Sequence, residues 1–148
     1  MPALWDAGRA DAPATHVLIV GIGAYAHQID GGKAPHAEPL STNARSALAV
    51  LDWVFEAHAE SHFDPPLGGV YAAVSDPKMG TDPVEVETPD GTKTLPLPTI
   101  DALRDLVTPW WMALNRNEGN AALGYFCGHG SANQTSFLLS EDYGSAPL

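Results

Sequence analysis

The sequence predicts an α/β domain with a mostly parallel sheet, and the order of its apolar segments supports this prediction. Residues 16–22 form an unbroken apolar run rich in β-branched side chains, which is typical of a strand buried on both faces. Two further short apolar runs, 69–74 and 121–127, predict two more buried strands. Apolar residues recur at helical spacing from 41 to 62 and from 99 to 114. Strands that alternate with helices in this way favour a sheet of parallel strands.

Both predicted helices are expected to start at or near a hydroxyl residue. Ser41 or Thr42 is expected to cap the first helix, which frays out by His62, because short hydroxyl side chains accept hydrogen bonds from the unpaired N–H groups of a first turn. The second helix is expected to start near Thr99. Pro109 can lie inside it only by bending the helix or by starting a new segment.

The rest of the chain divides into an N-terminal arm, a long loop and an inserted hairpin around one core. Residues 1–14 are small, polar and proline-containing, and form an N-terminal arm that docks or stays mobile. We expect residues 15–148 to form the N-terminal part of one domain. Residues 23–40 predict a long surface loop, and 75–98 an inserted β-hairpin with a Pro-Asp-Gly turn. A fourth candidate strand covers 136–139.

Composition and charge narrow the classes of partner. The chain has 148 residues, 45% of them apolar, which suits a single globular domain. Its 18 acidic and 7 basic residues give a net charge of −11, which disfavours nucleic acid and anionic membrane surfaces. The N-terminus lacks the pattern of a secretory signal and no run is long enough to cross a bilayer, so we expect a cytoplasmic protein. A lone cysteine, Cys127, fits a reducing compartment.

The candidate chemistry lies where the predicted parallel strands end. In open parallel sheets, functional side chains gather just beyond the carboxyl ends of the strands. There, His129 stands between Gly128 and Gly130. An imidazole with a pKa of about 6.5 can take a proton from a thiol and return it to a leaving amine. A simple turn histidine is an equally good interpretation of this spacing alone.

Four segments together resemble the caspase-like cysteine peptidases, the group of metacaspases, paracaspases and caspases. The first strand leads into Gly21-Ile22-Gly23-Ala24-Tyr25, similar to that family's Gly-Ile-x-x-Tyr. The other matching segments, in chain order, are Leu40–Ala47 at the start of the first helix, Phe126–Gly130 and Leu138–Asp142. The resemblance covers roughly residues 15–142, and several motifs in the expected order are more specific than any one of them.

The resemblance implies a caspase-like three-layer αβα sandwich, incomplete in this chain, that hydrolyses peptide bonds. His129 would be the general base, and the backbone N–H of Gly130 would help to stabilise the oxyanion. The nucleophilic cysteine would lie beyond residue 148 or on another chain, so this chain alone would be inactive. The partners would then be a protein or peptide substrate and the remainder of the caspase-like domain. No cofactor and no metal ion are implied.

The sequence also departs from the family pattern. Arg45 and Ser46 replace an Asn-Asp pair, and the loop before Leu40 lacks an arginine that caspases direct at an acidic substrate residue, so the substrate preference is left open. Cys127 occupies the position of a small family residue that packs behind the histidine. A buried apolar setting would raise its pKa, so we expect Cys127 to be a packing residue and not the nucleophile.

Three alternatives remain open at this stage. The domain could be a caspase-like module without catalytic activity, whose sheet edge docks a partner. Residues 21–26 also fit a Gly-x-Gly-x-x-Ala dinucleotide-binding turn, which requires a helix directly after it. His58 and His62 are four residues apart on the predicted first helix and could share a metal ion, although a solvated helix end explains them more simply.

Overall fold

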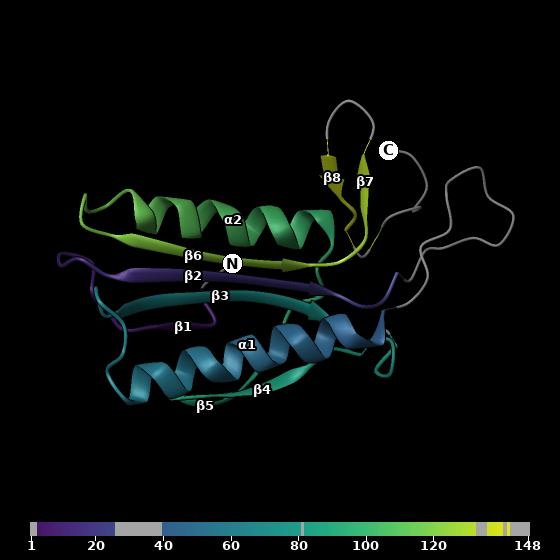
Figure 1. Cartoon of the computed structure of the whole chain (residues 1–148), viewed down its shortest axis with the longest axis horizontal. Helices are drawn as coiled ribbons and strands as arrows, with labels where there is room; N and C mark the ends of the chain where they lie inside the picture. Colours follow the sequence, from purple (N-terminus) through teal and green to yellow (C-terminus); the bar gives the residue numbers. More distant parts are fainter. Residues whose placement is uncertain (1–2, 26–39, 81, 133–135, 141, 143–148) are drawn as a thin grey trace, which may run out of the picture.

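The structure is a computed structural model that describes residues 3–25, 40–80, 82–132, 136–140 and 142. Within these residues a four-stranded sheet has the order β1-β3-β2-β6 (Figure 1). β3 and β6 both run parallel to β2, and the short β1 runs antiparallel to β3. The strands are β1 Trp5–Asp6, β2 Thr15–Ile22, β3 Leu67–Ser75 and β6 Ala121–Cys127. The predicted α/β class with a mostly parallel sheet is therefore confirmed.

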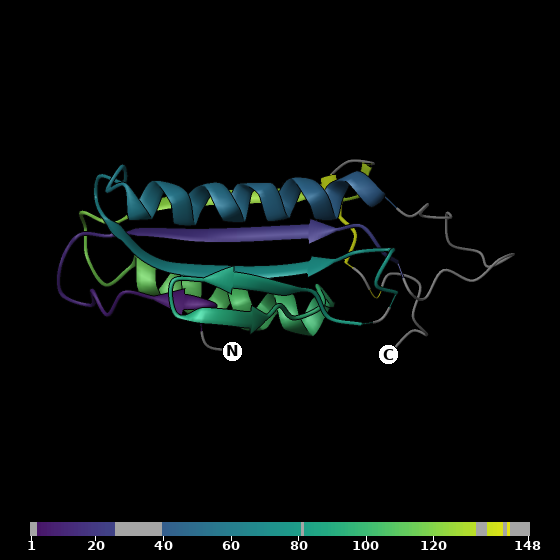
Figure 2. The ribbon, with the colours of Figure 1, turned by 90° about the horizontal axis from the view of Figure 1, so that it is seen from below.

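The two helices cover opposite faces of this sheet. Neighbouring residues of a strand point to opposite faces. Accordingly Val17 and Ile19 of β2 pack in one cluster with α1 (Ser41–Ala59), while Leu18 and Val20 pack in a second cluster with α2 (Ile100–Leu114). Figure 2 shows the sheet between the two helices. The double coverage explains why every residue of β2 is buried.

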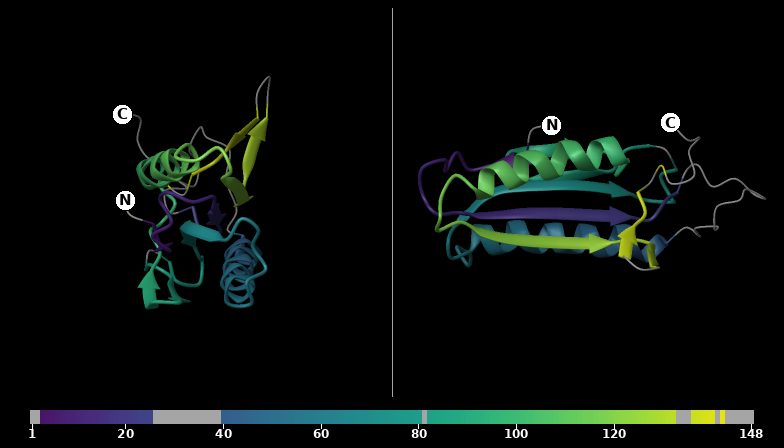
Figure 3. Two further views of the ribbon diagram at one scale, coloured as in Figure 1. Left: turned by 90° about the vertical axis from the view of Figure 1, so that its left-hand side faces the viewer. Right: turned by 90° about the horizontal axis from the view of Figure 1, so that it is seen from above.

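β6 is an edge strand, and the prediction that residues 121–127 are buried is wrong. Its residues alternate between half-buried and exposed, and the Phe126 side chain is 48% exposed. β2 pairs with one side of β6 and no described strand pairs with the other. α2 packs on β3 and β2, which leaves one face of β6 uncovered (Figure 3, right). An apolar run of this length does not distinguish a central strand from an edge strand.

The two helices begin differently. α1 begins at Ser41, and the residue before it, Leu40, makes no side-chain capping bond, so the predicted cap at Ser41 or Thr42 is wrong. Both hydroxyl residues already lie within the first turn. Thr99 does cap α2, because its side chain accepts a hydrogen bond from the N–H of Ala102 at 3.2 Å. Pro109 lies inside α2, which is assigned without interruption from Ile100 to Leu114.

Two small hairpins complete the described chain. β4 (Glu85–Thr88) and β5 (Gly91–Thr94) pair antiparallel within the segment predicted as an inserted hairpin. Near its base, Lys93 donates a hydrogen bond to the carbonyl of Leu4 at 2.8 Å, which joins the hairpin to the N-terminal arm. β7 (Gly130–Ala132) pairs with β8 (Ser136–Leu138) outside the main sheet. Among the described residues, no helix has the length and apolar character needed to span a membrane.

Candidate functional site

The carboxyl ends of β2, β3 and β6 lie level with one another at one edge of the sheet. Near the end of β2, Gly21 pairs with Val74 of β3 on one side and with Cys127 of β6 on the other. The segments that follow these strands therefore leave the sheet side by side. Tyr25, after β2, and His129, after β6, come together by this register even though they are 104 residues apart in the sequence.

Tyr25 holds the backbone and the ring of His129. The N–H of His129 donates a hydrogen bond of 2.6 Å to the Tyr25 hydroxyl oxygen. The two rings also pack with centroids 5.2 Å apart and planes inclined by 46°. Tyr25 is only 6% exposed, so it provides a fixed surface, whereas the His129 side chain is half-buried. The contact limits how the imidazole can turn relative to the sheet.

The protonation of Tyr25 is also set by its surroundings. Burial raises the pKa of Tyr25 above its usual value of about 10, because the phenolate would lose hydration. The hydrogen bond from the His129 N–H acts in the opposite direction, since it stabilises a negative oxygen. The net shift is upward, so Tyr25 is a neutral phenol at physiological pH and can donate its own hydroxyl proton as well as accept.

Polar side chains from β3 and α1 fix the segment that carries Tyr25. The buried Ser75 hydroxyl accepts a hydrogen bond from the N–H of Ala24 at 3.2 Å and lies 3.3 Å from the Ala24 carbonyl, to which it donates. Asn43 of α1 donates from its side-chain amide to the carbonyl of Ile22 at 3.2 Å. These bonds satisfy backbone groups that the sheet no longer pairs. The exit of β2 is therefore held from two sides.

Two glycines allow the close approach of these segments. A Cβ atom at Gly23 would lie 2.8 Å from the carbonyl oxygens of both Leu40 and Ser75, which is too close for any side chain. At Gly128, a Cβ atom would be 3.3 Å from the Tyr25 hydroxyl and would press on the contact that positions His129. The glycine before the histidine thus has a local packing reason.

Gly130 presents its backbone N–H away from the β7–β8 hairpin. It faces Leu138 in that hairpin, and the N–H of Leu139 donates to the carbonyl of His129 at 2.9 Å. In an antiparallel ladder this arrangement places Gly130 and Leu138 at a non-hydrogen-bonded position, where both N–H groups point outward. Gly130 is exposed. Its N–H, next to His129 in the chain, is therefore not used by the hairpin.

Cys127 lies on a different face of the sheet from the Tyr25 contact. It pairs with Gly21, whose missing side chain would meet Ala47 of α1, so the position faces that helix. The Cys127 thiol contributes to raising the pKa of Tyr125, after the larger effect of burial, so the two side chains are neighbours. The chain bends at Gly128, so His129 does not share the face of Cys127 as a regular strand would require. Cys127 is half-buried and not fully enclosed.

The histidines proposed to share a metal ion are separated by the end of α1. The helix ends at Ala59, so His62 is not on it, contrary to the expectation. The His58 ring packs on Trp5 with centroids 4.6 Å apart, and His62 lies 3.4 Å from the Glu60 carboxylate at the surface. No group of three or more metal-ligating side chains occurs in the described part of the chain.

The geometry after β2 also differs from a dinucleotide-binding turn. Residues 23–25 are not helical, whereas that fingerprint requires a helix to begin directly after the glycines. Most of the predicted loop 23–40 lies outside the described residues. α1 begins only at Ser41. Within the described residues 23–25, the exit of β2 therefore does not resemble a phosphate site on a helix N-terminus.

Comparison with known proteins gives one relative and no family. The chain is 34% identical over 112 residues to the uncharacterized protein y4kE of Sinorhizobium fredii. The matched stretch is 66% of this chain but only 30% of the relative, so the chain corresponds to a minor part of that longer protein. No family model matches the chain. No solved structure matches it either.

The sequence indicated the position of His129 but not what holds it. In the sequence, Tyr25 is marked only as part of a motif, and no pattern marks Ser75 or Asn43 as a residue of the site. The available signal was a polar residue at the end of an otherwise apolar run, which describes Ser75 after Val74. No local pattern could have paired Tyr25 with His129, because their contact depends on the β2–β6 register.

Proposed function

We propose that this chain provides the general-base part of a caspase-like cysteine endopeptidase. The observation that carries the proposal is the placement of His129 at the carboxyl edge of a parallel sheet, where Tyr25 fixes it and the Gly130 N–H lies beside it. In the proposed enzyme the two helix-covered faces belong to a three-layer αβα sandwich that further segments complete.

The uncovered side of β6 is where the remainder of the domain would pack. β6 has an unpaired hydrogen-bonding edge among the described residues, and its Phe126 is 48% exposed. A strand added at this edge would end next to His129 if it ran parallel to β6, because parallel strands end at the same edge. Such a strand could carry the nucleophilic cysteine. The relative y4kE has most of its length outside the matched stretch, which is consistent with further segments.

The proposed chemistry is acyl transfer to a thiol. His129 takes the proton of the incoming cysteine thiol, and the thiolate attacks the carbonyl carbon of the scissile peptide bond. The Gly130 N–H donates to the oxyanion that forms on the carbonyl oxygen. As the tetrahedral intermediate collapses, the C–N bond breaks and the imidazolium returns its proton to the leaving amine. Water, deprotonated by the same imidazole, then hydrolyses the thioester and regenerates the thiol.

The test begins with the intact mass of the polypeptide purified from its source, which shows whether residues accompany this chain beyond residue 148. In that full assembly, His129→Ala is expected to reduce cleavage of a peptide library by about a thousandfold or more. His62→Ala, at an exposed histidine away from the site, is the matched control.

Cys127→Ser separates the two possible sources of the thiol. The proposal expects this variant to retain cleavage, because the nucleophile comes from another segment. Loss of cleavage in Cys127→Ser with a normal fold would instead make Cys127 the nucleophile. Undiminished cleavage in His129→Ala would overturn the assignment of the general base.

A non-catalytic docking module is the second candidate, and a surface feature favours it. α2 exposes large apolar side chains, with Trp111 61% and Met112 58% exposed. Exposed apolar groups of this size are typical of interaction surfaces. If the full assembly contains no cysteine that alkylating reagents label in a His129-dependent way, and cleaves no peptide, the docking module is the function that remains.

A further inference from the structure

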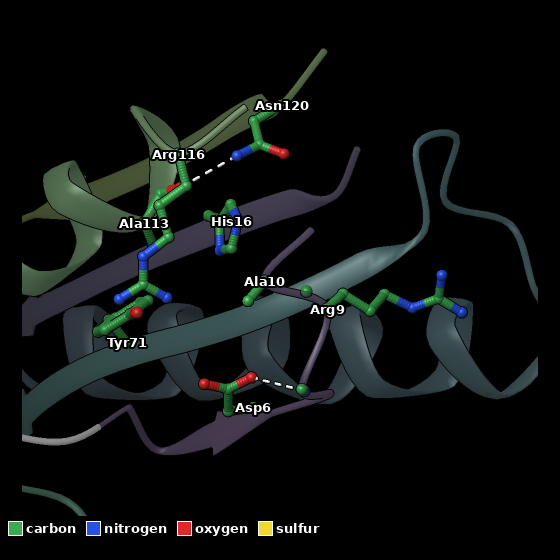
Figure 4. Close-up of a pocket in the computed structure, with 10 residues that line it drawn as sticks. Asp6, Arg9, Ala10, His16, Tyr71, Ala113, Arg116 and Asn120 are labelled. Carbon is green, nitrogen blue, oxygen red and sulfur yellow. Dashed lines mark hydrogen bonds between the residues drawn. The ribbon is translucent and has the colours of Figure 1, made fainter. Parts of the chain in front are cut away.

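A small polar cavity lies at the opposite end of the sheet from His129, where β2 and β3 begin. Its volume is about 70 Å³, and it is open to solvent on one side. His16 of β2 and Tyr71 of β3 form its floor, the N-terminal arm closes one side, and the C-terminal end of α2 closes the other (Figure 4). This volume is enough for several water molecules or one small ligand.

The imidazole of His16 forms part of the cavity floor. His16 is 8% exposed, and its Nδ1 atom is buried without a hydrogen-bond partner. That atom lies against Gly69 of β3, which does not line the cavity, so Nδ1 is out of reach of a ligand there. The Trp110 indole N–H donates to the His16 carbonyl at 3.1 Å and holds the backbone of this residue against α2. His16 therefore shapes the cavity, and the charged groups that bind a ligand come from other residues.

Two opposite charges flank the cavity without pairing with each other. Arg116 lies just past the end of α2 and Asp6 lies on the arm, and both line the cavity (Figure 4). No ion pair joins either residue to another charge within the described part of the chain. Asp6 raises the pKa of His16 and Arg116 lowers it, which places both charges within electrostatic reach of the imidazole. The Arg9 side chain, in contrast, extends away from this group (Figure 4).

The polar side chain of Asn120, which also lines the cavity, already has hydrogen-bond partners in the protein. The Asn120 side chain accepts from the N–H of Ala14 at 2.8 Å and donates to the carbonyls of Ala113 and Leu114. Asn120 therefore fixes the distance between α2 and the start of β2 and has no donor to spare for a ligand. The charged groups that can bind a ligand are the Arg116 guanidinium and the Asp6 carboxylate.

We propose that this cavity binds a small zwitterion of the chemical class of a free amino acid. The ligand carboxylate pairs with Arg116 and its ammonium group pairs with Asp6, above the floor that His16 and Tyr71 form. An anion alone would leave the Asp6 carboxylate opposing it, and a cation alone would be repelled by Arg116. A molecule that carries both charges is complementary to the flanking pair.

The first test is a titration of the chain with glycine. The backbone amide signals in ¹H–¹⁵N NMR spectra report the binding. Saturable shifts are expected at Gly8, whose N–H donates to Asp6, and at Gly68, which lines the cavity. Acetate carries only the negative charge of glycine, and methylammonium carries only the positive charge. Each is expected to bind at least about tenfold more weakly than glycine, because one charged pair is lost.

Substitutions at the two flanking charges provide the second test. Arg116→Gln and Asp6→Asn are both at exposed residues and each is expected to lower the glycine affinity by about tenfold. The matched controls are Arg104→Gln, on the same helix, and Asp11→Asn, on the same arm. Neither residue lines the cavity, so both control variants should bind as the parent chain does.

Two outcomes would overturn the proposal. If glycine produces no saturable shifts at the cavity, the space holds only water. If acetate binds as tightly as glycine and Asp6→Asn does not weaken either, the site is a simple anion site and not a zwitterion site. Both outcomes leave the peptidase proposal untouched, because that proposal depends on the other end of the sheet.

Discussion

The two ends of the parallel sheet each carry a histidine, and the surroundings of the two side chains differ. At the carboxyl end, His129 follows a strand, is half-buried and is held through its backbone and ring by Tyr25. At the amino end, His16 is inside a strand, is buried, and lines a cavity while its Nδ1 is enclosed without a partner. The first arrangement keeps an imidazole accessible for proton transfer. The second encloses an imidazole beside a volume that a small molecule can fill.

The packing around the two ends of the sheet also differs, because it is tighter at the carboxyl end. Near the carboxyl end, Gly21 lies directly against α1, where the Ala47 side chain and the Asn43 carbonyl leave no space. Near the amino end, Gly69 borders the side chains of His16 and Tyr71, which have the cavity beside them. The proposed catalytic end therefore has little freedom to adjust, whereas the cavity end can accommodate small changes.

Adding a methyl group at each end is expected to show the largest difference. In Gly21→Ala the new Cβ would meet the Ala47 Cβ and lie 3.3 Å from the Asn43 carbonyl oxygen, so the free energy of unfolding should fall by about 2–3 kcal/mol. In Gly69→Ala the neighbours are ring atoms at 3.2–3.3 Å that can move toward the cavity, and the loss should stay below about 1 kcal/mol. Urea unfolding measures both, and equal losses would contradict the comparison.

Removing the Tyr25 hydroxyl should have an intermediate effect. Tyr25→Phe keeps the ring against His129 but deletes the acceptor of its N–H, so stability should decrease by about 1 kcal/mol. The His129 ring signals in NMR spectra should shift as well. Tyr125→Phe, on the other face of the same edge, should leave those signals unchanged. If the His129 signals do not respond to Tyr25→Phe, Tyr25 does not position the imidazole.

The smallest effect we expect is a pH dependence that belongs to His16. Burial lowers the pKa of His16 below its usual value of about 6.5, with Arg116 acting in the same direction and Asp6 against it. Between the lowered pKa and about 6.5 the unfolded chain binds the extra proton, so stability rises with pH there and is lost as pH falls through that window. His16→Gln should remove this dependence and His62→Gln should not. A pH profile unchanged by His16→Gln would show that the imidazole is not desolvated.

Local signals explain which parts of the fold could be predicted. Alternating apolar strands and helical segments are such signals, and β2, β3 and the start of α2 near Thr99 follow from them. Burial of β6 does not, because the same apolar run suits a central or an edge strand. The cap at Ser41 or Thr42 failed because the residue before the helix is Leu40 and both hydroxyl residues already lie in the first turn.

Only part of the candidate site was predictable from the sequence. His129 stands out because glycines flank it at a strand end. Its contact with Tyr25 requires the β2–β6 register, and the cavity requires His16, Asp6 and Arg116 to meet from three separate elements. Positions that depend on long-range pairing carry no short-range signature.

The parallel pairing of β2 with β6 has a consequence for how the chain folds. Ala14 and Asn120, which hydrogen-bond at the start of this pairing, are 106 residues apart, so closing that contact costs far more chain entropy than closing a hairpin. The β2-α1-β3 unit has shorter loops and can assemble earlier. We expect β6 to join last, so that the Tyr25–His129 contact and the Asn120 side of the His16 cavity form in that final step. Neither end of the sheet acquires its binding groups before the whole fold is in place.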